Sequence, residues 1–180
     1  MVLIIKSHLQ VIHLIIEETI MNKVFLGIGT NLGDRKRNLR EAIKQIEEHI
    51  GKVLNSSSVY ETAPWGFEAE TDFLNMVILV ETIHSPGELL KKIFAIESGL
   101  GRERNQDRYS SRVIDIDILL YDDLMVDEKG LKIPHRLMHE RRFVLAPFCE
   151  IAPDLIHPKL RKRMSVLLEE CRDRTKISKL

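Results

Sequence analysis

The stretch that most constrains this chain is RVIDIDILLY, which runs from Arg112 to Tyr121. Its β-branched residues and its alternating pattern predict a β-strand. Successive side chains point to opposite faces of a strand, so Asp115 and Asp117 are expected to share one face, about 7 Å apart. The other face is apolar and consists of Ile114, Ile116, Ile118 and Leu120. Aspartate is depleted in strands, so two aspartates on one face need a compensating charge.

Arginines close to this strand in the sequence can supply that charge. They are Arg102, Arg104, Arg108 and Arg112. A guanidinium group binds phosphate bidentately and stays charged at any physiological pH. Two explanations remain open at this point. Either the acids and arginines form a solvated sheet face with incidental salt bridges, or they hold divalent cations and a polyphosphate.

The composition describes one globular domain without a strong overall charge. The chain has 180 residues, 44% of them hydrophobic, and its 27 basic residues balance its 27 acidic ones. We therefore expect neither nucleic acid nor a membrane surface as a partner, and any anion site must come from local clustering. The two cysteines, Cys149 and Cys171, have no zinc-type spacing. We expect them to be unpaired thiols of a cytoplasmic protein.

The first 20 residues differ from the rest of the chain. They are apolar, but residues such as Lys6 and His13 interrupt them, so no span of 18 apolar residues occurs. The pattern argues against a transmembrane helix or a signal peptide. We expect an appendage or an upstream start at residues 1–20, the main domain at 21–160, and a helix or tail of the same domain at 161–180.

The first two thirds of the chain predict elements in the order β-α-β-β-α-β. The predicted strands are residues 23–29, 53–60, 73–83 and 112–121, and the predicted helices are 34–50 and 86–97. Asp34 is the expected N-cap of the first helix, which stops near Gly51. Ser85 and Glu88 form a capping box at the start of the second helix.

This order is typical of an α+β fold with a ferredoxin-like split βαβ arrangement. It predicts an antiparallel sheet with helices packed mainly on one face. Asp115 and Asp117 are then expected on the other, partly open face. A hairpin at residues 125–133 and helices at 141–151 and 164–171 follow.

Glycines mark the end of the first predicted strand. Gly27, Gly29 and Gly33 have the spacing GxGxxxG, which is one residue longer than the dinucleotide-binding fingerprint GxGxxG. The chain has no Walker-type phosphate loop. A tight turn between strand and helix explains these glycines more simply.

Aromatic residues near the predicted loops indicate a site for a planar heterocycle. They are Trp65, Phe67, Phe73 and Phe143, and Asn75 lies two residues after Phe73. Rings provide stacking and an amide provides hydrogen bonds, although core packing explains Phe73 and Phe143 equally well. His135, Arg141 and Arg142 are candidates to extend the anion site, because cations oppose the dipole at a helix start.

Four colinear motifs carry a resemblance to a known family. They are LGIGTNLGD, YETAPWG followed by DFLN, GRERNQDRYSSRVIDIDILLY, and IPHRLMHERRFVLAPFCEIAPD. From about residue 23 to residue 158 the chain resembles the 6-hydroxymethyl-7,8-dihydropterin pyrophosphokinases of folate biosynthesis. The resemblance implies transfer of pyrophosphate from ATP to the pterin hydroxymethyl group, with release of AMP.

The resemblance also implies roles for individual residues. Asp115 and Asp117 match the pair that holds two magnesium ions, and Arg102 and Arg112 match arginines that engage phosphates during transfer. The positions that match the ATP site are Glu97, Arg102, Arg112, Ile118, His135 and Arg141. The positions that match the pterin site are Thr62, Ala63, Trp65, Phe73, Asn75 and Phe143. Loops 61–72 and 100–111 are expected to close over both substrates.

The chain departs from the family pattern at Tyr109, Ser110 and Arg136, but at no metal or pterin position. We expect a monomer that acts on small molecules. Two other functions remain possible: a different Asp-x-Asp nucleotidyltransferase, and a non-catalytic nucleotide-binding module.

Overall fold

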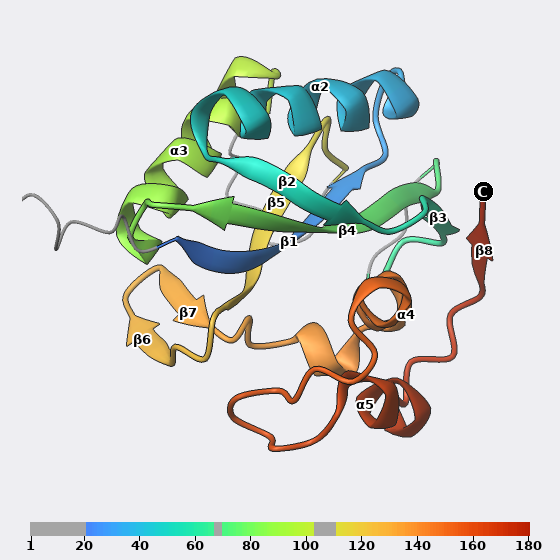
Figure 1. Ribbon diagram of the computed structural model, residues 1–180. Coiled ribbons are helices and arrows are strands. Elements are labelled where there is room, and N and C mark those ends of the chain that lie inside the picture. Colours follow the sequence, from blue (N-terminus) through green and yellow to red (C-terminus); the bar gives the residue numbers. More distant parts are fainter. Residues whose placement is uncertain (1–20, 67–69, 103–110) are drawn as a thin grey trace, which may run out of the picture.

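The computed structural model describes residues 21–66, 70–102 and 111–180. Its centre is an antiparallel sheet with the order β5-β1-β4-β3-β8, in which β2 also pairs with β4 (Figure 1). The strands are β1 (Asn22–Thr30), β2 (Lys52–Ser56), β3 (Tyr60–Thr62), β4 (Phe73–Thr82), β5 (Asp115–Tyr121) and β8 (Ile177–Lys179). A separate hairpin joins β6 (Val126–Glu128) to β7 (Leu131–Ile133). The ferredoxin-like α+β fold expected from the sequence is confirmed.

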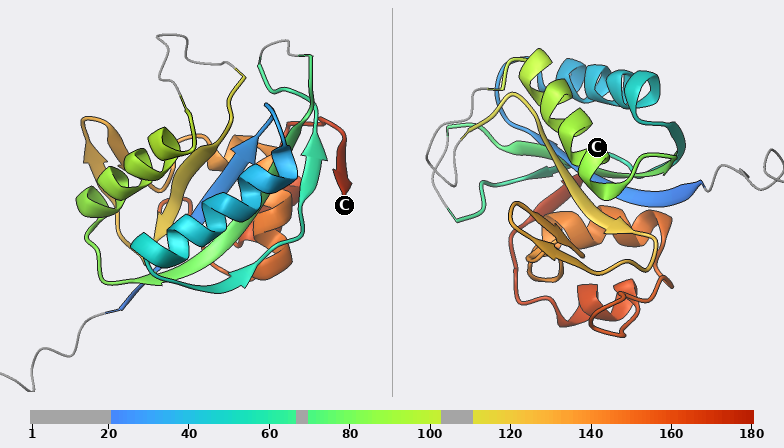
Figure 2. Two further views of the ribbon diagram at one scale, coloured as in Figure 1. Left: turned by 90° about the horizontal axis from the view of Figure 1, so that it is seen from above. Right: turned by 90° about the vertical axis from the view of Figure 1, so that its left-hand side faces the viewer.

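Two long helices, α2 (Arg35–His49) and α3 (Pro86–Gly99), cover one face of the sheet (Figure 2). Both begin as the sequence predicts, because the Asp34 carboxylate accepts a hydrogen bond from the Arg37 amide and Glu88 accepts one from the Ser85 amide. Helix α2 buries Leu39, Ala42 and Ile46 against the sheet. The period of these residues matches one face of a helix, which is why the sequence pattern located it.

The helices α4 (Arg142–Ile151) and α5 (Met164–Glu170) lie on the opposite face (Figure 1). They form a second core with Phe25, Val77 and Leu119, and the rings of Phe25 and Phe148 stack with centroids 4.4 Å apart. The short 3-10 helix η1 (Met138–Glu140) precedes α4. This face is thus only partly covered, and Asp115 and Asp117 lie on it, as expected.

A β-bulge changes the expected alternation along β5. The register between β1 and β5 shifts between Phe25 and Leu26, so that Leu119 has no direct partner. Ile114, Ile116 and Ile118 pack under α2 and α3, but Leu120 joins Leu119 in the second core. The expectation that Leu120 shares the face of the three isoleucines is therefore wrong, because the extra residue of a bulge reverses the alternation beyond it.

The predicted strand 53–60 is split into β2 and β3. At the break, Ser57 bonds to the Val77 backbone on both sides: its amide donates to the Val77 carbonyl (2.9 Å), and its hydroxyl accepts from the Val77 amide (3.0 Å). The short β8 pairs with β3, and the sequence did not predict it. Cys149 and Cys171 are both unpaired, as expected.

Several predictions concern residues outside the described ranges. They include the appendage at 1–20, Arg104, Arg108, Phe67 and the departures at Tyr109 and Ser110, together with parts of the two loops expected to close. In the part of the chain that the structure describes, no helix has the length and apolar character needed to cross a membrane.

Candidate active site

A cavity of about 540 Å³ opens on the partly covered face of the sheet, between β1, β4, β5 and the start of α4. All but two of the predicted site residues line it: Thr62, Ala63, Trp65, Phe73, Asn75, Arg102, Arg112, Asp115, Asp117, His135, Arg141 and Phe143. A volume in this range is enough for a nucleotide-sized ligand. The fold thus brings residues that are up to 81 positions apart, from Thr62 to Phe143, into one site.

Glycines in β1 form the floor of this cavity. Asp115 pairs with Gly29 and Asp117 with Gly27 across the β1–β5 ladder, while Gly29 pairs with Asn75 on β4. A Cβ at Gly29 would lie 3.0 Å from the Asn75 amide oxygen, so a larger residue would displace that side chain. Our explanation of Gly27 and Gly29 as a tight turn is therefore wrong, because both lie within β1 and keep the cavity open. Only Gly33 lies in the turn, with φ +65°.

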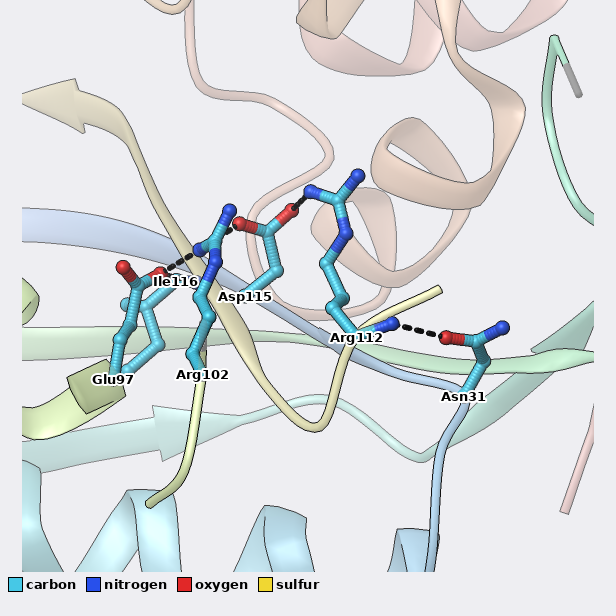
Figure 3. A network of polar contacts seen from close by, with 6 residues as sticks. All are labelled: Asn31, Glu97, Arg102, Arg112, Asp115 and Ile116. Atoms are coloured by element: carbon cyan, nitrogen blue, oxygen red, sulfur yellow. Dashed lines mark hydrogen bonds and ion pairs between the residues drawn. The ribbon is translucent and has the colours of Figure 1, made fainter. Parts of the chain in front are cut away.

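Arg102 and Arg112 converge on Asp115 from two sides (Figure 3). The Nη1 atom of Arg102 donates to one carboxylate oxygen of Asp115 at 2.5 Å, and Nη1 of Arg112 donates to the other at 2.5 Å. The Arg112 amide also donates to the side-chain oxygen of Asn31 at 2.7 Å. Two guanidinium groups therefore share the Asp115 carboxylate and lie beside the cavity, where either could bind an anionic group.

Glu97 holds Arg102 from behind and does not line the cavity. Its side chain is 1% exposed, and it accepts hydrogen bonds from Arg102 Nη1 and from the Ile116 amide at 2.8 Å (Figure 3). A buried carboxylate needs such partners because burying an unpaired charge is costly. Ile118 also lies away from the cavity, since its side chain belongs to the core under α2 and α3.

Asp117 occupies an environment that disfavours its charge. Burial and then the charge of the neighbouring Asp115 raise its pKa to about 7, with Arg141 opposing the rise. Carboxylate oxygens are the preferred ligands of magnesium, and a divalent cation would relieve the repulsion between the two aspartates. Among the described residues, no group of three or more histidine, cysteine or acidic side chains could hold a metal. The pair therefore fits a cation that takes its other ligands from phosphate and water.

Aromatic and amide groups line the other end of the cavity. Trp65 and Phe143 meet edge to face, with ring centroids 6.5 Å apart. The Asn75 amide donates to the Thr62 hydroxyl at 2.7 Å, and both residues are buried. Asn75 is thus fixed by Thr62, as a strand asparagine requires, and it lines the same cavity as the rings.

Arg141 interacts with both ends of the cavity, because its charge acts on Asp117 and its guanidinium contacts aromatic rings. Its guanidinium carbon lies 4.9 Å from the Trp65 ring centroid and 5.7 Å from that of Phe143. Its Nε atom is buried without a hydrogen-bond partner among the described residues. Burial lowers the pKa of His135 to about 4, and the charge of Arg141 contributes to this decrease. His135 is therefore neutral at physiological pH, with Nδ1 accepting from the Leu137 amide at 3.4 Å.

Sequence reasoning missed two cations at the cavity. Lys132 on β7 and Arg136 just after His135 both line it. Arg136 was noted only as a departure from the family pattern, and Lys132 sits in a polar hairpin with no distinctive motif. Arg142 does not line the cavity: its amide donates to Asp173 at 3.0 Å.

The fold and the cavity together define an α+β protein with a cavity that combines arginines and aspartates with aromatic rings. The family model described as 7,8-dihydro-6-hydroxymethylpterin-pyrophosphokinase (HPPK) matches residues 25–153. The chain belongs to this family, as its motifs indicated, and the expected enzyme class, a diphosphotransferase, is confirmed with it.

Two curated relatives are named 2-amino-4-hydroxy-6-hydroxymethyldihydropteridine pyrophosphokinase. The one from Aquifex aeolicus is 43% identical over 142 residues, which are 79% of this chain and 88% of that protein. The one from Bacillus subtilis is 41% identical over 131 residues, covering 72% and 78%. The solved structure of wild-type HPPK-DHPS from Plasmodium falciparum superimposes with a TM-score of 0.71 at 18% identity. It matches 86% of this chain, which spans 45% of that longer protein, and supports the fold alone.

Proposed function

We propose that this chain transfers the β,γ-diphosphoryl unit of ATP to the hydroxymethyl group of 6-hydroxymethyl-7,8-dihydropterin and releases AMP. One observation carries the proposal: a single cavity has paired arginines and aspartates at one end and an aromatic wall with a fixed amide at the other. Membership of the family supports the same reaction. We further infer that the enzyme is a monomer and that it is cytoplasmic. The two unpaired thiols favour the cytoplasmic location.

The acidic pair is the proposed site of two magnesium ions. Asp115 and Asp117 present carboxylates on the same face of β5. Burial and the neighbouring Asp115 raise the pKa of Asp117, so a bound cation would favour its charged form. When bound, magnesium would neutralise the triphosphate and polarise the phosphorus that is attacked. Protons and cations compete for Asp117, so metal binding is expected to weaken below about pH 7.

Arg102 and Arg112 supply positive charge to the phosphates. Both currently bind Asp115, and each would exchange this carboxylate for a phosphate oxygen when metal takes its place. Glu97 keeps its ion pair with Arg102 throughout, so the guanidinium stays at this place while it exchanges Asp115 for the phosphate. Charge neutralisation by these groups is the main catalytic term, as in other phosphoryl transfers.

The reaction needs alignment more than proton transfer. The pterin hydroxyl oxygen attacks the β-phosphorus and forms a new oxygen–phosphorus bond. The bond from that phosphorus to the α,β-bridging oxygen breaks, its electrons leave with AMP, and the hydroxyl proton passes to solvent. The rings of Phe73 and Phe143 and the amide of Asn75 would hold the pterin so that its hydroxyl lies in line with that bond. No residue is assigned as a general base.

Product analysis tests the proposal. The protein is incubated with ATP, magnesium and 6-hydroxymethyl-7,8-dihydropterin, and the nucleotide products are separated. We expect AMP in equal amount to the pterin diphosphate. ADP would indicate transfer of one phosphate, and inorganic pyrophosphate with an adenylated product would indicate a nucleotidyltransferase. Binding of ATP without any product would indicate a nucleotide-binding module. Each of these three results would overturn the proposal.

A further inference from the structure

The C-terminal segment from Arg172 to Leu180 touches both walls of the aromatic end of the cavity. It leaves α5, passes the start of α4 and ends as β8 beside β3 (Figure 1). Neither Asp173 nor any other residue of the segment lines the cavity. It can therefore act on the cavity only indirectly, through the residues of α4 and β3 that it contacts.

The first contact is at the start of α4. The Asp173 carboxylate accepts a hydrogen bond from the Arg142 amide at 3.0 Å. Arg142 is the first residue of α4, and its N-cap, Arg141, makes no side-chain capping bond. The first amides of a helix have no partner within the helix, so Asp173 acts as a cap supplied from 31 residues away. Its negative charge also suits the positive end of the helix dipole.

This cap sits between two residues of the cavity wall. Arg141 precedes Arg142 and Phe143 follows it, and both line the cavity and contact Trp65. The backbone direction at the first turn of a helix sets where the flanking side chains point. Fixing the Arg142 amide therefore fixes the positions of the Arg141 guanidinium and the Phe143 ring.

Asp173 is itself held in place. Its other carboxylate oxygen accepts from the Thr175 amide at 2.9 Å and from the Thr175 hydroxyl at 2.5 Å. With three donors, the carboxylate is rigid in its charged form. The segment then continues into β8 two residues later.

The second contact is at β3, which carries the opposite wall. In the ladder, Thr62 pairs with Ile177 and Tyr60 with Lys179, and the Leu180 amide donates to the Val59 carbonyl at 2.9 Å. Thr62 is the residue that fixes the amide of Asn75. The strand β3 has only three residues, so pairing on both sides is needed to hold it.

A polar cluster ties β3 and β8 to the far end of α4. Glu150 accepts hydrogen bonds from the Ser58 hydroxyl at 2.8 Å, the Tyr60 hydroxyl at 2.9 Å and the Lys179 ammonium at 3.0 Å. Helix α4 is thus attached to the C-terminal segment at its first residue and near its last. The segment forms a strap between helix α4, which carries Phe143, and strand β3, which ends three residues before Trp65.

We propose that this strap, through Asp173, is a positioning element for the acceptor end of the site: it sets Phe143 and Arg141 for pterin binding without touching either substrate. The inference rests on the proposed function. It predicts a larger effect on the pterin than on ATP: of the positions that match the ATP site, Arg141 adjoins the strap, whereas Arg102 and Arg112 are held by Glu97 and Asp115.

Steady-state kinetics of the full-length Asp173→Ala variant test the proposal. We expect the KM for the pterin to rise about tenfold, the size expected for losing a charged hydrogen bond, and the KM for ATP to rise by no more than about threefold, through the displaced Arg141. The Asp173→Asn variant keeps one oxygen that can accept from the Arg142 amide, so its pterin KM should return to within about threefold of wild type. Asp154→Ala is the matched control, since Asp154 is exposed and pairs with the exposed Arg163 at 3.4 Å, away from the residues that line the cavity; it should change neither KM.

A second readout separates positioning from a general loss of stability. Trp65 is the only tryptophan of the chain and contacts Arg141 and Phe143. Its fluorescence under native conditions should therefore shift in Asp173→Ala and not in Asp154→Ala. If Asp173→Ala does not fold, Thr175→Val removes one of the bonds that hold Asp173, and it should raise the pterin KM about threefold.

The outcomes distinguish this proposal from the proposed function. An unchanged pterin KM in the Asp173 variant, or equal rises in both KM values, overturns the role of the strap while leaving the reaction intact. A wild-type protein that makes no AMP overturns the reaction, and the Trp65 signal then still decides whether Asp173 sets the aromatic wall. An unshifted Trp65 signal contradicts the strap in either case.

Discussion

The two ends of the cavity are built in different ways. The charged end consists of Glu97, Arg102, Arg112, Asp115 and Asp117, which lie within 21 residues of sequence; ion pairs join the first four. The aromatic end is assembled from β3, β4, the start of α4 and, behind them, the C-terminal strap. The charged end therefore depends on a few strong local contacts, and the aromatic end on the relative placement of distant segments. Substitutions at the charged end should accordingly lower kcat, and substitutions at the aromatic end should weaken pterin binding.

The largest effect is expected at the acidic pair. Asp115→Ala or Asp117→Ala removes a proposed metal ligand and should lower kcat by about a thousandfold, in line with several kcal/mol of lost charge stabilisation. Circular dichroism should show an intact fold. The control is Asp123→Ala, in the exposed turn after β5, which should keep full activity. Near wild-type turnover in either variant would show that the metal assignment is wrong.

A smaller effect at the same end is expected for Arg102→Ala. Loss of one phosphate-binding guanidinium should lower kcat by about a hundredfold. The equilibrium dissociation constant for the pterin, measured by fluorescence titration, should stay within about twofold of wild type, because Arg102 belongs to the charged end. A large loss of pterin affinity would remove the distinction between the two ends.

Phe143→Ala is the counterpart at the aromatic end. It removes a ring that contacts Trp65 and should weaken pterin binding by about 2 kcal/mol, or about thirtyfold. The KM for ATP should be nearly unchanged. Phe94→Ala serves as the control, because this partly exposed phenylalanine of α3 lies away from the cavity. Equal losses for both substrates would argue against separate ends.

The smallest effect concerns pH and the stability of the protein without metal. Because burial raises the pKa of Asp117 from its usual 3.8 to about 7, the folded state binds a proton more tightly than the unfolded state. This contribution to stability is full below about pH 4 and is lost as the pH rises through about 7. Asp117→Asn should therefore melt at a higher temperature than wild type at pH 8, and by a smaller margin at pH 5, both in the presence of a chelator. Added magnesium should reduce the difference at pH 8. Identical melting at both pH values would contradict the placement of this carboxyl.

The placement of Asp115 and Asp117 on one strand face, near arginines, was predictable from the sequence because its signals are local. The alternation of Asp115, Ile116 and Asp117 in a strand, and the arginines before it, depend only on neighbouring positions. The ferredoxin-like order was also accessible, since each helix has its own cap and apolar period. The position of Glu97 came from the family resemblance, and the structure adds that Glu97 acts by holding Arg102.

Features set by partners distant in sequence were not predictable in the same way. The bulge that turns Leu120 to the other face is defined by the pairing of β5 with β1. Gly27 and Gly29 looked like turn residues because their real neighbours, Leu119 and Asn75, come from other strands. The strand β8 has only three residues, Ile177, Ser178 and Lys179, and no alternating run long enough to indicate a strand. It forms because β3 offers an edge to pair with.

The central claim is that both ends of the cavity serve one transfer, and the fate of the β-phosphate tests it most directly. ATP labelled at the β-phosphorus is supplied with magnesium and 6-hydroxymethyl-7,8-dihydropterin, and the label is followed by phosphorus NMR or by radioactivity. The account predicts that the label leaves the nucleotide and appears on the pterin, attached to the γ-phosphate, in equal amount to unlabelled AMP. Label that remains in ADP, or that appears as free pyrophosphate, would contradict it.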